Sequence, residues 1–328
     1  MKSYDVTALG ELLVDFTEHG VSTQGNPLYE ANPGGAPCNV LSMLQKLGRK
    51  TAFIGKIGKD PLGAMLREVV AKQGIAVQNL MTDSKTPTTL AFVHTASDGE
   101  RSFSFYRNPG ADQMLKKQEI DTALLHNTRL FHFGSLSMTT PESEAATRLA
   151  VDTAKRAGAL ISFDPNLRIA LWEGPEIARE KISYGISQCQ ILKISDDELS
   201  FFTGTKDMDK GVAQIQEQYH TPMICTTMGK RGSRVYYAQM CVECGPFLNE
   251  KTVETTGAGD TFMACVLHWI LTYGLEGLDQ QRLLEMLEFA NAASSIITTR
   301  KGALNVMPGE CDVWSFLQQR KKSIIGIN

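Results

Sequence analysis

Short apolar runs alternate along this chain with longer amphipathic segments. The runs have the length and composition of buried β-strands. They lie at residues 6–9, 52–55, 130–133, 160–163, 191–193 and 223–227. Apolar residues recur at helical spacing in 39–47, 61–70, the segment after Asp260, and 281–297, which we expect to be the last long helix. Strands that alternate with helices in this way predict an α/β fold with a mainly parallel sheet.

Two segments interrupt this alternation. The segments 88–93 and 101–106 flank Ser97-Asp98-Gly99-Glu100, which is typical of a β-hairpin turn. Polar and turn residues also fill the stretch from about 12 to 33. We expect residues of about 12–33 and 88–107 to form a small β-sheet that stands off the main domain and acts as a lid. The chain 1–328 is then one domain with this lid inserted into it.

The composition is that of an ordinary globular protein. Of 328 residues, 42% are hydrophobic and 21% are charged, and the net charge is −3. This balance provides no basic field for nucleic acid or an anionic membrane surface, and the basic residues 320–322 are interpreted as a short solvated tail. Because the chain has no run of about 18 apolar residues and no signal-peptide core, we expect a cytoplasmic protein.

The seven cysteines are interpreted as mainly buried thiols, because an odd number spread along a large chain does not resemble a disulfide framework. Cys241 and Cys244 form a Cys-x-x-Cys pair in a strand-like run. No second pair follows at zinc-finger spacing, so metal or redox use of this pair is the minor alternative. His132, inside an apolar run, is interpreted as a core histidine.

The stretch Gly257-Ala258-Gly259-Asp260 stands where a helix begins. Glycines there allow a ligand to approach the backbone closely, and the free N–H groups and the helix dipole favour an anion such as phosphate. Asp260 has two interpretations. As an N-terminal cap it would stabilise the helix. As a functional residue beside a bound phosphate, it would accept a proton.

Polar residues also follow the first predicted strand and precede the first predicted helix. Asp15 lies a few residues beyond the strand at 6–9. Gly34 and Gly35 stand before a helix start, where Asn39 offers an amide that can hydrogen-bond a hydroxyl. A simple turn that leads into a helix explains the two glycines equally well.

Three later strand ends carry candidate residues. The strand at 160–163 leads into Asp164-Pro165-Asn166-Leu167-Arg168, at the edge where open α/β sheets bind ligands. After 191–193, Ser195-Asp196-Asp197-Glu198 fits a capping box, and Glu198 is also a candidate ligand of Mg2+ through water. After 223–227, a Gly-x-x-Gly turn is suited either to nucleotide phosphates or to a plain hairpin. Neither the dinucleotide fingerprint nor the P-loop motif occurs, which disfavours an NAD-dependent dehydrogenase.

Together these stretches resemble the ribokinase or PfkB family of carbohydrate kinases over almost the whole chain. Residues 34–39 (Gly-Gly-Ala-Pro-Cys-Asn) resemble its N-terminal signature, 255–262 its C-terminal signature and 227–232 its nucleotide turn. The resemblance implies a Rossmann-like three-layer α/β/α domain with a mainly parallel sheet and a small β-sheet lid. It also implies that ATP and Mg2+ bind over the C-terminal half, that the sugar binds beneath the lid, and that lids pair in homodimers.

The resemblance also implies roles for matching residues. Asp260 would accept the proton of the attacking sugar hydroxyl, and the N–H groups of Gly257, Ala258 and Gly259 would hold the transferring phosphoryl group. The implied sugar-binding residues are Asp15, Gly34, Gly35, Asn39, Arg107 and Arg168. The implied ATP-binding residues are Thr227, Gly229, Gly232 and Asn291. Glu198 would bind Mg2+ through a water molecule.

Two positions depart from the family pattern. Glu254 stands where the family usually has Asp beside a monovalent-cation site, which leaves K+ activation open. Ser195 replaces the Asn of the metal-linked Asn-x-x-Glu motif, as in many fructokinase-like members. These departures motivate one alternative, a non-catalytic sugar- or nucleotide-binding regulator.

The segments 105–112 and 164–172 are most similar to those of fructokinases. Phosphorylation of the primary hydroxyl of D-fructose is therefore the leading hypothesis. The rival within the family is 2-keto-3-deoxygluconate kinase, which uses arginines near positions 107 and 168 to bind a substrate carboxylate.

Overall fold

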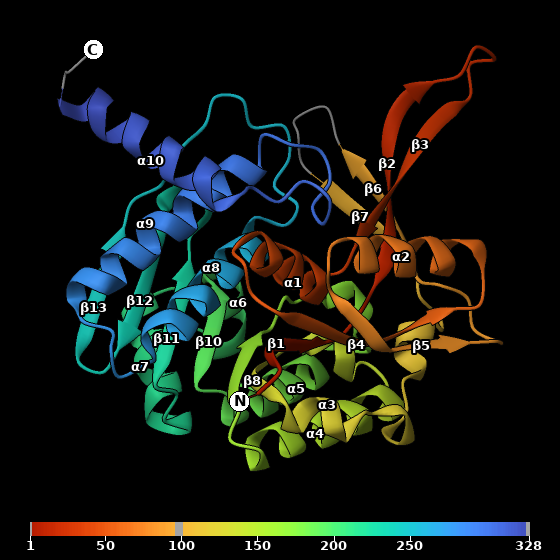
Figure 1. Ribbon diagram of the computed structural model, residues 1–328, viewed down its shortest axis with the longest axis horizontal. Coiled ribbons are helices and arrows are strands. Elements are labelled where there is room, and N and C mark those ends of the chain that lie inside the picture. Colours follow the sequence, from red (N-terminus) through yellow and green to blue (C-terminus); the bar gives the residue numbers. More distant parts are fainter. Residues whose placement is uncertain (1, 96–100, 326–328) are drawn as a thin grey trace.

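The computed structural model describes residues 2–95 and 101–325 and contains two β-sheets (Figure 1). The larger sheet has nine strands. Their spatial order is β13 (Met240–Cys244), β12 (Ser233–Tyr237), β11 (Met223–Thr227), β10 (Ile191–Ser195), β9 (Leu160–Asp164), β8 (Thr128–Gly134), β1 (Tyr4–Leu9), β4 (Thr51–Gly58) and β5 (Ala76–Asp83). From β11 to β5 neighbouring strands run parallel, while β12 and β13 add an antiparallel hairpin at one edge. Each apolar run predicted above is a strand of this sheet.

Helices cover both faces of the large sheet (Figure 1). On one face lie α1 (Ala36–Lys46), α2 (Pro61–Lys72), α8 (Ala258–Tyr273), α9 (Gln280–Ile297) and α10 (Glu310–Ile325). On the other lie α3 (Thr122–His126), α4 (Pro141–Arg156), α5 (Pro175–Gln188), α6 (Asp196–Thr203) and α7 (Met208–Tyr219). Along β1, Val6 and Ala8 join the first core and Leu9 the second, as expected of a parallel strand that is buried on both sides. The predicted three-layer α/β/α architecture is confirmed.

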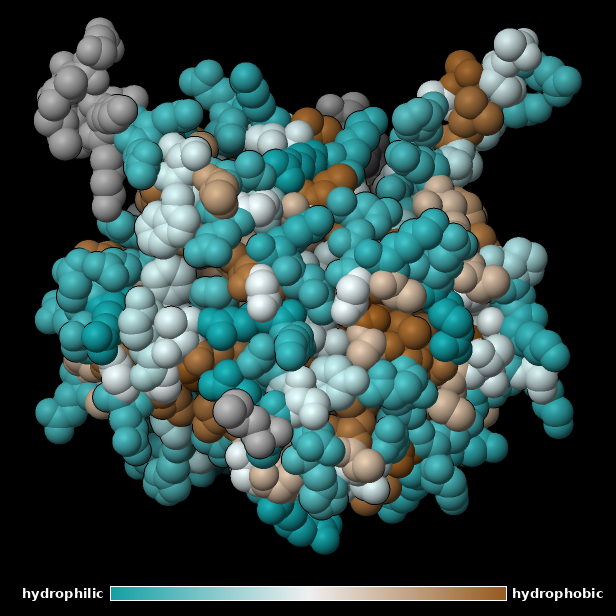
Figure 2. Space-filling model, in the orientation of Figure 1, coloured by the Kyte–Doolittle hydropathy of each residue, from teal (hydrophilic) through white to brown (hydrophobic). Residues whose placement is uncertain are grey.

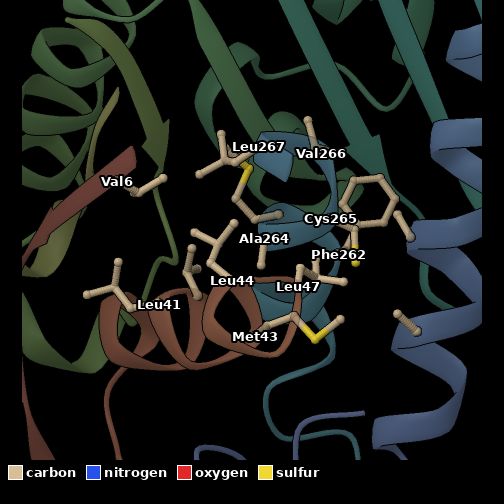
Figure 3. Packing of buried hydrophobic residues seen from close by; sticks show 14 of the residues in the cluster. Val6, Leu41, Met43, Leu44, Leu47, Phe262, Ala264, Cys265, Val266 and Leu267 are labelled. Carbon is tan, nitrogen blue, oxygen red and sulfur yellow. The ribbon is translucent and has the colours of Figure 1, made fainter. Parts of the chain in front are cut away.

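Helices α1 and α8 pack directly against each other beside the sheet. Figure 3 shows Met43 and Leu44 of α1, with Leu47 just after its C-terminal end, packed in one cluster with Ala264 and Leu267 of α8. These side chains are at most 5% exposed, so the contact removes apolar surface from water at about 25 cal/mol per Å2. Because the two helices pack together, the glycine turns that precede them lie close to each other.

The second sheet has four strands and projects from the main body (Figure 1). Their order is β3 (Pro27–Gly34), β2 (Leu13–Val21), β6 (Leu90–Thr95) and β7 (Arg101–Tyr106). Hydrophobic residues are visible on the projecting β2–β3 hairpin in Figure 2. The segments expected to form a small sheet are therefore paired with each other, while the predicted turn Ser97–Glu100 lies outside the described residues.

Two expectations about the ends of elements were wrong. The helix at 281–297 is not the last one, because α10 follows it and packs with Val313 and Leu317 against the core. The basic residues 320–322 belong to α10 and are not a separate tail. In addition, β5 was not predicted. Its centre carries the polar Asn79, which is buried and bonded to the backbone of Glu119 and Asp121.

The Cys-x-x-Cys pair and His132 both lie on strands of the large sheet. On β13, Cys241 is exposed and Cys244 is buried, since residues three apart on a strand point to opposite faces. His132 is 1% exposed and its Nδ1 lies 2.9 Å from Oγ of Ser162. Burial lowers its pKa to about 3, which confirms a neutral core histidine. Within the described residues, none of the helices has the length and apolar character needed to cross a membrane.

Candidate active site

The polar residues at the strand ends meet around two adjoining cavities. The first, of about 630 Å3, lies at the C-terminal ends of β9, β10 and β11, between the start of α1 and the start of α8. The second, of about 550 Å3, lies between the turn after β11 and helix α9. Gly229, Thr255 and Gly259 line both cavities. The cavities therefore meet beside the first turn of α8.

The start of α8 is the predicted anion cradle. Gly257 is its N-cap residue and has a φ of 77°, in the left-handed region that favours glycine. A Cβ at this position would lie 2.8 Å from Cβ of Ala303. The first N–H groups of a helix have no partner inside the helix, and the dipole adds partial positive charge. These N–H groups lie between the two cavities, and their binding of an anion stays a prediction.

Asp260 lies in the first turn of α8 and is 9% exposed. Its Oδ2 accepts a hydrogen bond of 2.8 Å from Nδ2 of Asn39. The interpretation of Asp260 as a cap is wrong, because Gly257 is the N-cap residue and no side chain caps this helix. Burial raises the pKa of Asp260, although the hydrogen bond from Asn39 and the positive charges of Lys193 and Arg168 oppose the shift. A carboxyl group with a raised pKa at the wall of a cavity is suited to accepting a proton.

The turn before α1 brings Asp15, Gly34 and Gly35 together. Gly35 has a φ of 128°, and a Cβ there would lie 2.3 Å from the backbone oxygen of Glu11. A Cβ at Gly34 would lie 2.3 Å from Oδ2 of Asp15. Oε1 of Glu11 accepts a hydrogen bond of 2.9 Å from the N–H of Ala36, and burial raises the pKa of Glu11 to about 7. The two glycines are therefore required by close contacts with the loop after β1 and the start of β2.

A buried ion pair joins β9 and β10 at the wall of the first cavity. Nζ of Lys193 lies 3.0 Å from Oδ2 of Asp164. Burial alone would lower the pKa of Lys193, but the carboxylates of Asp164 and Glu198 outweigh it, so the pKa is raised and the lysine is charged. Glu198 accepts 2.8 Å hydrogen bonds from the N–H groups of Ser195 and Leu167, and the predicted capping box is confirmed.

The second cavity is mostly apolar and lies over the turn after β11. Gly229 and Gly232 both have positive φ values, 54° and 96°. Asn291 does not extend freely into the cavity. Its Nδ2 donates to the backbone oxygens of Cys244 and Gly245, and its Oδ1 accepts from Oγ of Ser233. Asn291 thus ties α9 to the end of β13 at the cavity floor.

A comparison with known sequences identifies the family. The sequence profile described as pfkB family carbohydrate kinase matches residues 4–309. The chain belongs to the pfkB family of carbohydrate kinases. The resemblance noted from its motifs is confirmed.

Similar proteins support this family membership over the full length of the kinase. This chain is 40% identical to "Probable fructokinase-2" of Arabidopsis thaliana over 315 residues, and the aligned region covers 95% of each chain. A fructokinase from Xylella fastidiosa with bound ATP superimposes with a TM-score of 0.88 at 28% identity, covering 98% of this chain and 100% of the other. A Vibrio cholerae fructokinase with bound fructose, ADP and calcium superimposes with a TM-score of 0.85 at 28% identity, covering 96% and 99%.

The two arginines expected at the substrate lie in different surroundings in this pfkB kinase. Arg168 is exposed and lines the first cavity. Arg107 is 6% exposed and does not line it. Its guanidinium donates to Oδ2 of Asp112 at 2.8 Å, to Oγ1 of Thr139 at 3.0 Å and to the backbone oxygen of Leu136 at 2.9 Å. In this structure Arg107 does not point into the first cavity, because Asp112, five residues later, holds its guanidinium, and its contact with a substrate stays a prediction.

Two residues of the kinase site escaped the sequence analysis. Glu11 is the second residue after β1, and Lys193 lies within the apolar run of β10. Both line the first cavity. A charged residue within or directly after a buried strand was the available signal, since such residues are rarely buried without a partner.

Proposed function

We propose that this chain is a fructokinase that transfers the γ-phosphoryl group of ATP to the primary hydroxyl of D-fructose. The observation that carries the proposal is the position of Asp260 between a polar cavity and the anion cradle at the start of α8. The names of the similar proteins support fructose as the sugar.

In the proposed reaction, Asp260 accepts the proton of the attacking hydroxyl while the hydroxyl oxygen forms a bond to the γ-phosphorus. The bond from that phosphorus to the leaving oxygen of ADP breaks. The N–H groups at Gly257, Ala258 and Gly259 stabilise the charge on the transferring group. Loss of one such preorganised donor costs about 3 kcal/mol in comparable anion sites. Phosphoryl transfer depends on positioning and on this electrostatic stabilisation.

The proposed substrate positions follow from the two cavities. Fructose would lie in the first cavity, where Asp15, Asn39 and Arg168 supply polar groups and Gly35 lets the sugar approach the backbone. Gly34 does not line the cavity itself and acts through its close contact with Asp15. The ATP base would lie in the second, apolar cavity. Its phosphates would follow the turn at Thr227, Gly229 and Gly232 toward α8, and Asn291 supports the floor.

The residues at the site fit magnesium held through water rather than by a protein cage. Both oxygens of Glu198 accept backbone N–H groups, and the described residues contain no cluster of three His, Cys, Asp or Glu side chains suited to a metal. Mg2+ typically keeps several waters and binds substrate phosphates, whose charge it neutralises. Glu198 would hold such a water.

A role of Glu254 at a monovalent-cation site remains a separate proposal. Its carboxylate is 7% exposed, and Oε1 accepts a hydrogen bond of 3.1 Å from the N–H of Gly302. This contact ties the stretch before α8 to the loop after α9. We propose that K+ bound near these two loops would order the cradle, as a similar fructokinase with bound potassium suggests.

A panel of sugars tests the substrate assignment. We expect kcat/KM for fructose to exceed that for 2-keto-3-deoxygluconate by at least about tenfold, or roughly 1.4 kcal/mol. The reason is that Asp112 neutralises Arg107, so this arginine is not available for a substrate carboxylate. Sugar-dependent release of ADP is the measurement. A preference for the sugar acid would overturn fructose as substrate, and sugar binding without ADP release would favour the non-catalytic regulator.

We further propose that the small sheet is a lid and that two lids pair in a homodimer. Phe16, Tyr29, Phe92 and Tyr106 form an aromatic cluster with ring centroids 5.1 to 5.5 Å apart. Because neighbouring residues of a strand point to opposite faces, this cluster lies on the face opposite Asp15. Tyr106 is 65% exposed. A second copy would cover these rings by a two-fold contact.

Light scattering tests this pairing. The wild-type protein is expected to have the mass of a dimer, and Tyr106→Glu that of a monomer at micromolar concentration, because a charge would be buried against aromatic rings. Tyr106→Phe is the matched control and should remain dimeric. A monomeric wild-type protein would contradict the proposal.

A further inference from the structure

Lys193 is a buried lysine at the wall of the first cavity that the reaction described above does not use. It is 7% exposed and is the middle residue of β10. Its Nζ lies 3.0 Å and 3.2 Å from the two carboxylate oxygens of Asp164. A buried ammonium is costly unless it is paired, so the structure maintains this charge at this place with a dedicated partner.

The ammonium lies beside the anion cradle. A Cβ at Gly259 would come within 3.2 Å of Nζ of Lys193. Glycine at 259 therefore leaves the space between the backbone of the cradle and the ammonium open. An anion that binds the N–H groups at the start of α8 would lie next to this positive charge.

The carboxylates around Lys193 would repel a phosphoryl group that binds beside it. Asp164, Glu198 and Asp260 each interact electrostatically with Lys193. Among the described residues that line the cavity, the positive charges are those of Lys193 and Arg168, and Arg168 is exposed. A phosphoryl group that enters beside these three carboxylates is repelled unless a cation offsets them.

The ammonium also has hydrogen-bonding capacity for a ligand. It carries three donors, and within the described part of the chain its hydrogen bonds go to Asp164. The remaining capacity suits phosphate oxygens, which lysine binds as a point charge.

We propose that Lys193 is a catalytic residue whose ammonium contacts the transferring phosphoryl group, while Asp164 holds the ammonium in position. This proposal rests on the proposed kinase function. Lys193 keeps its protons throughout. The proton of the sugar hydroxyl goes to Asp260, the new bond forms between the sugar oxygen and phosphorus, and the bond to the oxygen of ADP breaks.

The test compares Lys193→Met with the wild-type enzyme. The variant removes the charge at similar length, and we expect kcat to fall about 100-fold while KM for fructose changes less than about threefold. Binding of the non-hydrolysable analogue AMP-PNP should weaken about tenfold, whereas binding of ADP, which lacks the γ-phosphoryl group, should stay within about twofold. Lys155→Met, at an exposed lysine on α4, is the control and should match the wild type.

A second variant addresses folding, because Lys193→Met leaves Asp164 buried without its partner. Lys193→Met combined with Asp164→Asn removes both charges and keeps the shapes similar. It should melt close to the wild-type temperature and show the same loss of kcat. A kcat within about threefold of the wild type in a folded variant, or equal weakening of AMP-PNP and ADP binding, would overturn the proposal. No ADP release by the wild-type enzyme would instead contradict the proposed function.

Discussion

Replacing Asp260 with Asn is expected to lower kcat by at least about 1,000-fold and to leave ATP binding intact. A positioned general base contributes about 100- to 10,000-fold, and an amide of the same shape cannot accept the proton. ATP binding should persist because Asp260 does not line the second cavity. Initial rates of ADP release and calorimetric titration with ATP are the measurements. Asp152→Asn, at an exposed aspartate on α4, is the control.

The pH dependence of the wild-type enzyme supplies an independent check on Asp260. The base works in its ionised form, so kcat/KM must decline as the pH falls through its pKa. Burial raises that pKa, and the decline should therefore occur above the value of about 4 that is usual for aspartate. Retained turnover in Asp260→Asn, or an acid decline at the usual value, would contradict the assignment.

Replacing Gly35 with Ala is expected to lower kcat/KM for fructose by about 1,000-fold. The new Cβ would lie 2.3 Å from the backbone oxygen of Glu11, so the turn before α1 must shift. A displacement of 1 Å near reacting groups costs about 100-fold, and the φ of 128° adds strain for any residue with a Cβ. The shift would also disturb Asn39, which donates to Asp260. Steady-state kinetics with fructose measure the effect.

A substitution at a second glycine separates the effect of backbone strain from the effect of a displaced turn. Gly158 has a φ of 68° and nothing within 4 Å of its Cβ position. Gly158→Ala should therefore lose about 1 kcal/mol of unfolding free energy and keep its activity. Gly35→Ala should bind ATP normally, because Gly35 does not line the second cavity. A Gly35→Ala enzyme with normal kcat/KM would show that turnover of the sugar does not depend on the conformation of this turn.

The regular strands and helices were predictable because the local pattern of apolar residues indicates which of their side chains are buried. The runs of β1, β8, β9, β10 and β11 are apolar on both faces, as parallel strands must be. Strand β5 was not predictable in this way. Its Asn79 is buried because the backbone near Glu119 and Asp121, about 40 residues away in sequence, completes its hydrogen bonds. Helix α10 was missed because only a few apolar residues of an otherwise polar helix, among them Val313, Phe316 and Leu317, pack against the core.

The candidate site was predictable where the motif itself constrains the backbone. Glycines at 35 and 257 have positive φ values, so their roles follow from residue type as well as from position. The charged residues were less predictable. Arg107 looked free in the sequence but is held by Asp112, whereas Lys193 looked like part of a strand and lies beside the cradle.

The sequence by itself determined the alternation of strands and helices, the glycine turns at both helix starts and the place of Asp260 among them. Only the tertiary structure decided what Asp260 does in its helix. Packing of α1 against α8 brings Asn39 within 2.8 Å of its carboxylate, across a separation of 221 residues. It likewise decided which charges face the cavity, because the pKa and the orientation of a buried side chain depend on partners that come from distant parts of the chain.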